Sequence, residues 1–238
     1  MEGGRGNFTG GAIPVIVGIM RRSDYPTPVI GIAGGIGAGK SIVARGLQDL
    51  GCLVIDSDAV AHEVIQRPQV KRDLVAWWGS GILRENGTVD RREVARHVFG
   101  RPDEVQRLNN LLHPLVAAER DRVMAEAAGN AQIAGVVWDT PLLFEVGWDR
   151  LCDAVIFVKV PYKQRLHRVH ESRGWDRAEL DKRENLQMPL DKKENLADYV
   201  LDNSGEVITS LRQLRDFFSQ IQAKKQSSAN RPPEGFSP

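Results

Sequence analysis

Five short apolar runs recur along the chain, and each is nearly continuous in apolar residues. They are Val29–Ala33, Leu53–Ile55, Val136–Trp138, Ala154–Val160 and Tyr199–Leu201. Runs of this length without alternating polar residues are typical of parallel β-strands that are covered by helices on both faces. The pattern therefore predicts the strands of a parallel sheet.

Helical patterns separate these runs. They cover Ser41–Leu50, Ala59–Ile65, Pro102–Ala128, Tyr162–Ser172 and Glu206–Ala223. Strands that alternate with helices along the chain favour an α/β fold with a doubly wound parallel sheet.

The length of 238 residues is enough for one complete core, and we predict one domain over residues 28–222. Within it, residues 60–132 are mostly helical and are interpreted as an inserted subdomain. Residues 162–193 are rich in charge and are interpreted as a mobile helical hairpin. The glycine-rich residues 1–27 are predicted to be a flexible extension, and the polar, proline-rich residues 223–238 a disordered tail.

Charge and composition narrow the class of protein. The net charge is +1, with 32 basic and 31 acidic residues, so no global field attracts a polyanion and nucleic acid is not an expected partner. The apolar stretch Ala12–Met20 is shorter than the ~20 residues of a membrane span. Its basic pair follows it, whereas a secretory signal carries basic residues ahead of it. Cys52 and Cys152 lack metal-ligand spacing and are interpreted as reduced thiols. We therefore predict a cytoplasmic protein, and we expect no membrane partner.

The clearest motif is a phosphate-binding loop. Residues 34–41 read GGIGAGKS and match G-x-x-x-x-G-K-[ST], with Gly34, Gly39, Lys40 and Ser41 in the defining places. A strand-like run precedes the motif and an amphipathic helical pattern follows it, as the motif requires. Glycines allow the backbone to turn successive N–H groups toward phosphate oxygens, and the helix dipole adds to the attraction. The motif predicts a nucleoside triphosphate site, with the lysine on the β- and γ-phosphates and the serine hydroxyl on a magnesium ion.

The main rival class is a GTPase switch or another nucleotide-driven binding protein. A GTPase carries D-x-x-G after the third element and usually N-K-x-D for guanine. Here residues 138–142 read WDTPL, without that glycine, and N-K-x-D does not occur. The pattern therefore favours an ATP-dependent kinase that acts on a small acceptor.

Two aspartates follow the second apolar run, in the segment VIDSDAVAHEVI. Ligands of open α/β sheets bind outside the carboxyl ends of the strands, so Asp56 and Asp58 are expected on the side of the phosphate loop. A carboxylate there is suited to accept the proton of an attacking hydroxyl. An aspartate just before Ala59 is also typical of a helix N-cap, so the residues leave Asp58 open between base and cap. Asp139 ends the third run and fits either a magnesium site or the cap of the next turn.

Arginines recur at helical spacing in the charged stretch: Arg165, Arg168, Arg173 and Arg177. Most such runs are solvated helix faces. Placed after a strand and a proline, however, they also fit a lid whose arginine stabilises the transferring phosphoryl group.

Together these segments resemble the dephospho-coenzyme A kinase family. The resemblance rests on GGIGAGKS, VIDSDAVAHEVI, LNNLLHP, DTPLLFE, the segment around RLHRVHESRG and QMPLDKKENLADYVLDNSG, which together span residues 29–222. DTPLLFE and the last segment are more specific to the family than the phosphate loop.

The resemblance implies the reaction and several roles. ATP would phosphorylate the ribose 3′-hydroxyl of dephospho-coenzyme A, with Mg²⁺ as cofactor. The sequence itself leaves open whether the protein is a monomer or a weak homo-oligomer. Asp58 matches the family's catalytic base, Arg168 its lid arginine, and His113 a histidine beside the acceptor, in the helical insertion. The ATP-binding loop would comprise Gly35, Ile36, Gly37, Ala38, Gly39, Lys40, Ser41 and Ile42.

The chain also departs from the family pattern. Ala33 stands where relatives commonly have threonine, and Ile42 replaces a frequent second hydroxyl, which leaves Ser41 as the loop's candidate metal ligand. His62 stands in place of an arginine, which puts an acceptor contact in doubt. The spacing from Arg168 to Arg173 is one residue longer than usual, which weakens the transfer of a role to Arg173.

Overall fold

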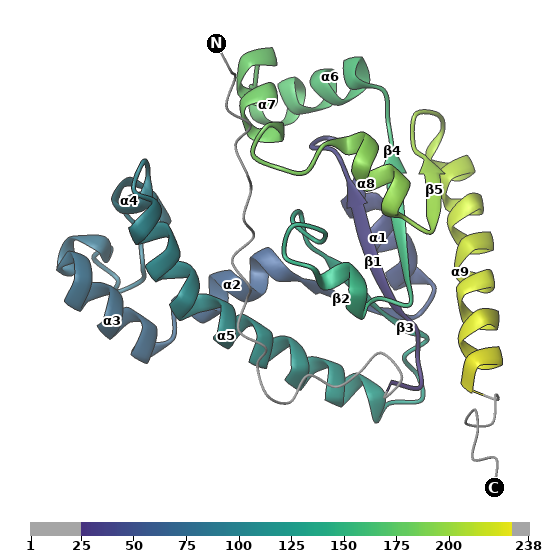
Figure 1. The fold of residues 1–238 in the computed structure, drawn as a ribbon, viewed down its shortest axis with the longest axis horizontal. Helices are drawn as coiled ribbons and strands as arrows, with labels where there is room; N and C mark the ends of the chain where they lie inside the picture. The colour runs from purple at the N-terminus through teal and green to yellow at the C-terminus, as the bar shows by residue number, and fades with distance from the viewer. Residues whose placement is uncertain (1–24, 230–238) are drawn as a thin grey trace, which may run out of the picture.

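A five-stranded sheet forms the centre of the fold (Figure 1), within residues 25–229, which the computed structural model describes. Its strands are β1 (Val29–Gly34), β2 (Cys52–Asp56), β3 (Gly135–Asp139), β4 (Ala154–Lys159) and β5 (Tyr199–Asp202). The spatial order is β2-β3-β1-β4-β5, and every neighbouring pair is parallel. The prediction of a parallel sheet is confirmed, because all five predicted strands are present with bounds that differ by no more than one residue at either end.

The register of the strands brings polar residues to one edge of the sheet. Asp56, the last residue of β2, lies directly opposite Asp139, the last residue of β3, and Asp139 is also the partner of Ile32 in β1. The next residues of β1 lead into the phosphate loop. Because parallel strands end at the same edge, segments far apart in sequence meet there.

Helices cover both faces of the sheet, as predicted. On one face lie α1 (Lys40–Asp49) and α9 (Val207–Ala229), whose fully buried Leu47 and Leu214 pack into a common core with β1 and β4 (Figure 1). The other face is covered by the C-terminal part of α5 (Pro102–Ala128) and by α8 (Leu190–Leu196). Burial on both faces accounts for the continuous apolar runs of the strands.

A helical subdomain projects to one side of the sheet (Figure 1). It comprises α2 (Ser57–Ile65), α3 (Pro68–Trp78), the short 3₁₀ helix Ser80–Ile82, α4 (Arg91–Val98) and the N-terminal part of α5. Its buried residues form a cluster separate from the two cores of the sheet: Val64, Ile65, Val70, Leu74, Ile82, Val89, Val94 and Val116. The subdomain therefore has its own small core.

The long helix α5 joins this small core to the sheet. Arg120, a buried residue of α5, lies over both Trp138 on β3 and Trp148 in the 3₁₀ helix Trp148–Leu151, with its guanidinium carbon 5.3 and 5.1 Å from the ring centroids. The two rings contact each other edge to face, with centroids 5.7 Å apart. The guanidinium also pairs with Asp121 at 2.6 Å. These contacts attach α5 to the sheet.

The charged stretch after β4 forms two helices. α6 (Tyr162–Arg173) ends at Gly174, which has a φ of 67° that favours glycine. α7 (Arg177–Glu184) begins after Asp176, whose side chain accepts a hydrogen bond from the N–H of Glu179. The chain then returns to the sheet through α8 (Figure 1).

Two predicted boundaries are corrected at the ends of the domain. Tyr25 lies within the predicted flexible extension but is buried against the core of the sheet, and residues 1–24 lie outside the described part of the chain. The predicted disordered tail begins too early, because α9 continues to Ala229. Lys225 in that last part of α9 pairs with Asp153 at 3.0 Å, a tertiary contact that the polar composition of the segment does not reveal. Residues 230–238 lie outside the described part.

We predict that Leu74→Ala lowers the free energy of unfolding by about 2–5 kcal/mol, because it leaves a cavity in the small core of the subdomain. Leu74 is fully buried there. Equilibrium denaturation monitored by tryptophan fluorescence measures this change, since Trp77 and Trp78 lie on the same helix. Ala76→Ser, an exposed change on α3, is the control and should stay within about 0.5 kcal/mol. A wild-type stability for Leu74→Ala would show that the small core contributes nothing to folding.

Candidate active site

The phosphate loop connects β1 to α1 with the geometry that the motif predicts. Gly37 and Gly39 have φ values of 77° and 86°, and Gly39 is the N-cap of α1. A side chain at Gly39 would also place its Cβ 2.5 Å from Nδ2 of Asn203. Backbone conformation and close packing both require glycine here, and the first N–H groups of α1 are left for an anion.

Lys40 lies inside the loop rather than in solvent. Its Nζ donates hydrogen bonds to the carbonyl oxygens of Gly34 at 3.0 Å and Gly35 at 3.1 Å. Burial lowers the pKa of Lys40 to about 8, and the nearby Asp139 carboxylate opposes that shift. These two hydrogen bonds hold the ammonium group of Lys40 against the start of the loop.

Asp139 lies close enough to Lys40 for the two charges to interact. Burial raises the pKa of Asp139, the Lys40 charge lowers it, and the negative charges of Asp56 and Asp58 raise it further. Asp139 therefore stands between the lysine of the phosphate loop and the two aspartates at the start of α2. Among the described residues, Asp139 accepts no hydrogen bond from a backbone N–H, so capping of the next turn does not explain it.

The cap of α2 is Asp56, and the alternative that Asp58 is the cap is wrong. The carboxylate of Asp56 accepts hydrogen bonds from the N–H groups of Asp58 at 2.9 Å and Ala59 at 3.0 Å. Helix α2 begins at Ser57, two residues earlier than predicted, so Asp58 lies within its first turn. Its side chain is exposed at the edge of the sheet. The role of a base is the alternative that remains for Asp58.

Arg168 approaches the phosphate loop from α6. Its guanidinium donates to the carbonyl oxygens of Ala38 at 3.4 Å and Asn203 at 2.9 Å. The buried Asn203, just after β5, also donates to Ala38 from its side chain at 2.8 Å. Asn203 was not among the predicted site residues, although it lies in the family-specific segment ADYVLDNSG.

Lys193 of α8 is a second residue that the sequence analysis missed. It is 1% exposed, pairs with Glu145 at 2.8 Å and donates to Gln187 at 3.2 Å and to the Pro141 carbonyl oxygen at 3.3 Å. Glu145 also accepts a hydrogen bond from the N–H of Met188. This network joins the segment DTPLLFE after β3 to the segment QMPLDKK after α7. The family-specific segments contain all these residues, but nothing in the sequence shows that a lysine in so polar a helix is buried.

Ser41 and His113 lie apart from these hydrogen-bond networks. Ser41 is exposed in the first turn of α1, beside Lys40. His113 is exposed on α5, in the helical subdomain. The structure therefore brings together Lys40, Ser41, Asp58, Asp139 and Arg168 around the phosphate loop, and it places His113 on the neighbouring subdomain.

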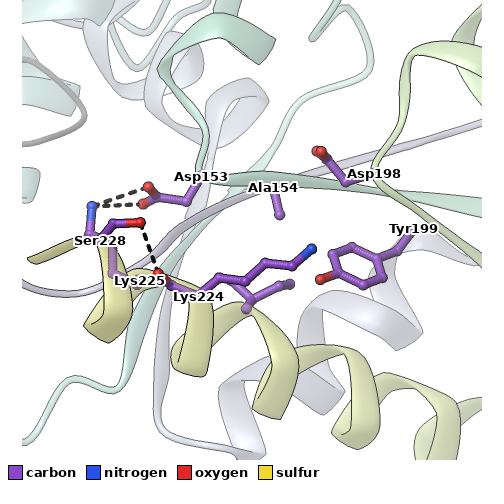
Figure 2. Close-up of a pocket in the computed structure, with 8 residues that line it drawn as sticks. Asp153, Ala154, Asp198, Tyr199, Lys224, Lys225 and Ser228 are labelled. Atoms are coloured by element: carbon purple, nitrogen blue, oxygen red, sulfur yellow. Dashed lines mark hydrogen bonds and ion pairs between the residues drawn. The ribbon is translucent and has the colours of Figure 1, made fainter. Parts of the chain in front are cut away.

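A small cavity of about 60 Å³ lies elsewhere, between the start of β4, the start of β5 and the end of α9 (Figure 2). Asp153 and Lys225 form an ion pair in its wall, and Lys224 extends along the ring of Tyr199 (Figure 2). These residues lie at the amino end of the strands, opposite the phosphate loop, so the cavity is not part of the candidate active site.

Two classes of feature are absent from residues 25–229. No group of three or more histidine, cysteine, aspartate or glutamate side chains there is arranged to hold a metal ion by itself. In the same range, none of the helices combines the length and the apolar character needed to cross a membrane. Cys52 and Cys152 are both buried, and no disulfide joins them.

Comparison with known proteins agrees with this arrangement. The sequence profile of the family described as dephospho-CoA kinase matches residues 28–209. Dephospho-CoA kinase of Carboxydothermus hydrogenoformans is 37% identical over 189 residues, which cover 79% of this chain and 91% of the relative. The enzyme of the same name from Deinococcus radiodurans is 40% identical over 176 residues, which cover 74% of this chain and 84% of the relative.

Solved structures show the same fold. The structure of TT1252 from Thermus thermophilus matches with a TM-score of 0.70 and 33% identity, over 82% of this chain and 97% of that protein. Dephospho-CoA kinase from Campylobacter jejuni matches with a TM-score of 0.57 and 20% identity, over 82% and 98%, which supports the fold alone. With its phosphate loop, its carboxylates and these relatives, the chain belongs to the dephospho-CoA kinase family.

Proposed function

We propose that the chain carries out the reaction of its family, the ATP-dependent phosphorylation of dephospho-coenzyme A at the ribose 3′-hydroxyl. The observation that supports this most strongly is the position of Asp139 at the sheet edge, where it interacts with Lys40 of the phosphate loop on one side and with Asp56 and Asp58 on the other. A phosphate site beside a carboxylate that is not used as a cap is the arrangement that phosphoryl transfer to a hydroxyl requires.

The ATP site comprises the loop Gly35–Ile42, with Lys40 facing the β- and γ-phosphates. Among the described residues, oxygen donors near Lys40 fit a magnesium ion: the hydroxyl of Ser41 and the carboxylate of Asp139. Within residues 25–229, no group of three or more acidic, histidine or cysteine side chains could hold a metal ion by itself. A magnesium ion that keeps several waters and is bound largely by phosphates does not need such a group. When bound there, Mg²⁺ neutralises charge on the phosphates that are being transferred.

The acceptor site lies between the phosphate loop and the helical subdomain. Asp58 is in the first turn of α2, where the sheet edge meets that subdomain, so it is placed to take the proton of the 3′-hydroxyl. We assign His113 on α5 to the acceptor side, away from the phosphates. α6 and α7 form the lid, and Arg168 stabilises the negative charge of the transferring phosphoryl group.

The proposal also includes the substrates, the cellular compartment and the oligomeric state of the enzyme. Its substrates are ATP and dephospho-coenzyme A, and a balanced net charge of +1 gives it no attraction for nucleic acid. We infer a cytoplasmic monomer or weak homo-oligomer. Size-exclusion chromatography with light scattering measures the oligomeric state directly.

We predict that ADP formation by the purified protein requires both dephospho-coenzyme A and magnesium. The assay compares dephospho-coenzyme A with adenosine monophosphate, cytidine monophosphate and shikimate under identical conditions. Mass spectrometry of the product then locates the new phosphate. Turnover of a nucleoside monophosphate without turnover of dephospho-coenzyme A would identify a nucleotide kinase and remove the proposed acceptor.

Lys40 gives the ATP affinity a specific pH dependence. Because the pKa of Lys40 is lowered to about 8 in the free enzyme, only about a tenth of the molecules carry the charged lysine at pH 9. ATP binds the charged form, so its Kd should be nearly constant below pH 7.5 and rise about tenfold per pH unit above 8. Isothermal titration calorimetry measures this, and proton uptake on binding should appear over the same range. Lys40→Met should bind ATP weakly and without the pH step. A wild-type Kd that stays flat to pH 9.5 would show that burial does not lower the pKa of Lys40.

Two substitutions distinguish the proposed role of Asp58 as a base from the role of Asp56 as the cap of α2. Asp58→Asn keeps the volume but cannot accept a proton, so we expect wild-type stability and a kcat that falls by about a hundredfold or more, within the usual range for a general base. Asp56→Ala removes a helix cap and should lower the free energy of unfolding by about 0.5–2 kcal/mol. Steady-state kinetics and thermal melting are measured on both variants. If Asp58→Asn keeps more than about half of wild-type kcat, Asp58 is not the base.

A further inference from the structure

Two charged residues of the lid meet at the tip of the phosphate loop. Glu184, the last residue of α7, accepts a hydrogen bond from the backbone N–H of Ile36 at 3.0 Å and forms an ion pair with Arg165 of α6. Arg165 in turn donates from Nη1 to the carbonyl oxygen of Ile36 at 3.2 Å. The pair therefore holds both backbone polar groups of a single loop residue.

This ion pair is largely out of solvent. The side chains of Arg165 and Glu184 are 5% and 17% exposed, and Nε of Arg165 also donates to the carbonyl oxygen of Val160 at 3.3 Å. A buried pair with its hydrogen bonds made is rigid, and the loss of one member leaves the other without compensation. The pair is also neutral as a unit, so it adds little net charge to a phosphate site.

The loop is packed directly against this pair. A Cβ at Gly35 would lie 2.7 Å from Nη1 of Arg165, and a Cβ at Gly37 would lie 2.8 Å from the carbonyl oxygen of Arg165. Glycine at these two places therefore lets α6 approach the loop, in addition to allowing the turn itself. Residues 35–37 are therefore in direct contact with α6.

We propose that Arg165 and Glu184 are a positioning pair that fixes the tip of the phosphate loop, through Ile36, in the conformation that receives ATP. This rests on the proposed function of the loop as the ATP site. Neither side chain contacts ATP in this account. The pair acts by orienting the peptide groups on either side of Ile36 and by coupling them to the lid.

Three substitutions at Glu184 distinguish the effect of its side-chain length, which lets it accept from the N–H of Ile36, from the effect of its negative charge. Glu184→Gln keeps the length and an oxygen that accepts from the N–H of Ile36, whereas Glu184→Asp keeps the charge but withdraws the carboxylate by one methylene. Glu184→Ala removes both. If the pair acts through Ile36, Gln stays within about threefold of the wild-type ATP Kd, while Asp and Ala raise Kd about five- to tenfold, the size of one lost hydrogen bond.

Calorimetry measures Kd for ATP without any acceptor, so the result does not depend on which acceptor the enzyme uses. Hydrogen exchange of the Ile36 amide, measured without nucleotide, should be slow in the wild type and in the Gln variant and fast in the Asp and Ala variants. The matched control is Glu179→Ala, which breaks the more exposed pair with Arg183 on the same helix and should leave both quantities unchanged. Melting temperatures are recorded for all variants. If the Ala variant does not fold, the comparison of Glu184→Gln with Glu184→Asp still shows whether the length or the charge of the side chain matters.

Two results would overturn the proposal. If Asp matches the wild type while Gln and Ala are equally impaired, the charge of Glu184 matters and its reach to Ile36 does not. If all three variants bind ATP as well as or better than the wild type, Glu184 does not position the loop, and tighter binding would show that it competes with phosphate. A wild-type protein that binds ATP but does not phosphorylate dephospho-coenzyme A would refute the proposed function and leave this test intact.

Discussion

A loop that presents backbone N–H groups to an anion turns its carbonyl oxygens the other way, and those oxygens need partners of their own. In this protein, long side chains provide several of them. Lys40 binds the oxygens of Gly34 and Gly35, Arg165 binds that of Ile36, and Arg168 and Asn203 bind that of Ala38. Three of these four side chains come from elements more than 120 residues away from the loop in sequence. The phosphate loop is thus held by the sheet, by α6 and by the end of β5 at once.

The same edge of the sheet balances its charges locally. Lys40 interacts with Asp139, Arg165 pairs with Glu184 and Lys193 pairs with Glu145, whereas the half-buried Arg168 binds backbone carbonyl oxygens. Such a site draws in a polyphosphate without a strong field over the whole surface, which agrees with the net charge of +1. The register of β2 and β3 places Asp56 beside Asp139 at this edge. Asp56 is the N-cap of α2, so Asp58 is not needed as a cap.

The sequence predicts the sheet and the phosphate loop well because their signals are local. A continuous apolar strand, a glycine-rich turn with Lys40 and an amphipathic helix follow one another within about twenty residues. The residues alone could not decide whether Asp58 is a helix cap or a base. Both Asp56 and Asp58 stand near the start of α2, and the identity of the cap depends on where the helix begins. Glu184 and Lys193 were missed because burial of a charged side chain depends on tertiary partners such as Arg165 and Glu145. The end of α9 was placed too early for a similar reason: a contact of Lys225 with Asp153 extends a helix whose composition favours disorder.

We propose that one edge of the sheet holds ATP and presents the acceptor hydroxyl to Asp58. The most direct measurement is a crystal structure with a non-hydrolysable ATP analogue, magnesium and dephospho-coenzyme A, in which the distance from the 3′-oxygen to the Asp58 carboxylate is read directly. This account predicts hydrogen-bond contact, about 2.6–3.2 Å, with Asp56 still bonded to the N–H groups of Asp58 and Ala59. A 3′-oxygen held by another residue, with Asp58 farther away than one bridging water, would contradict it.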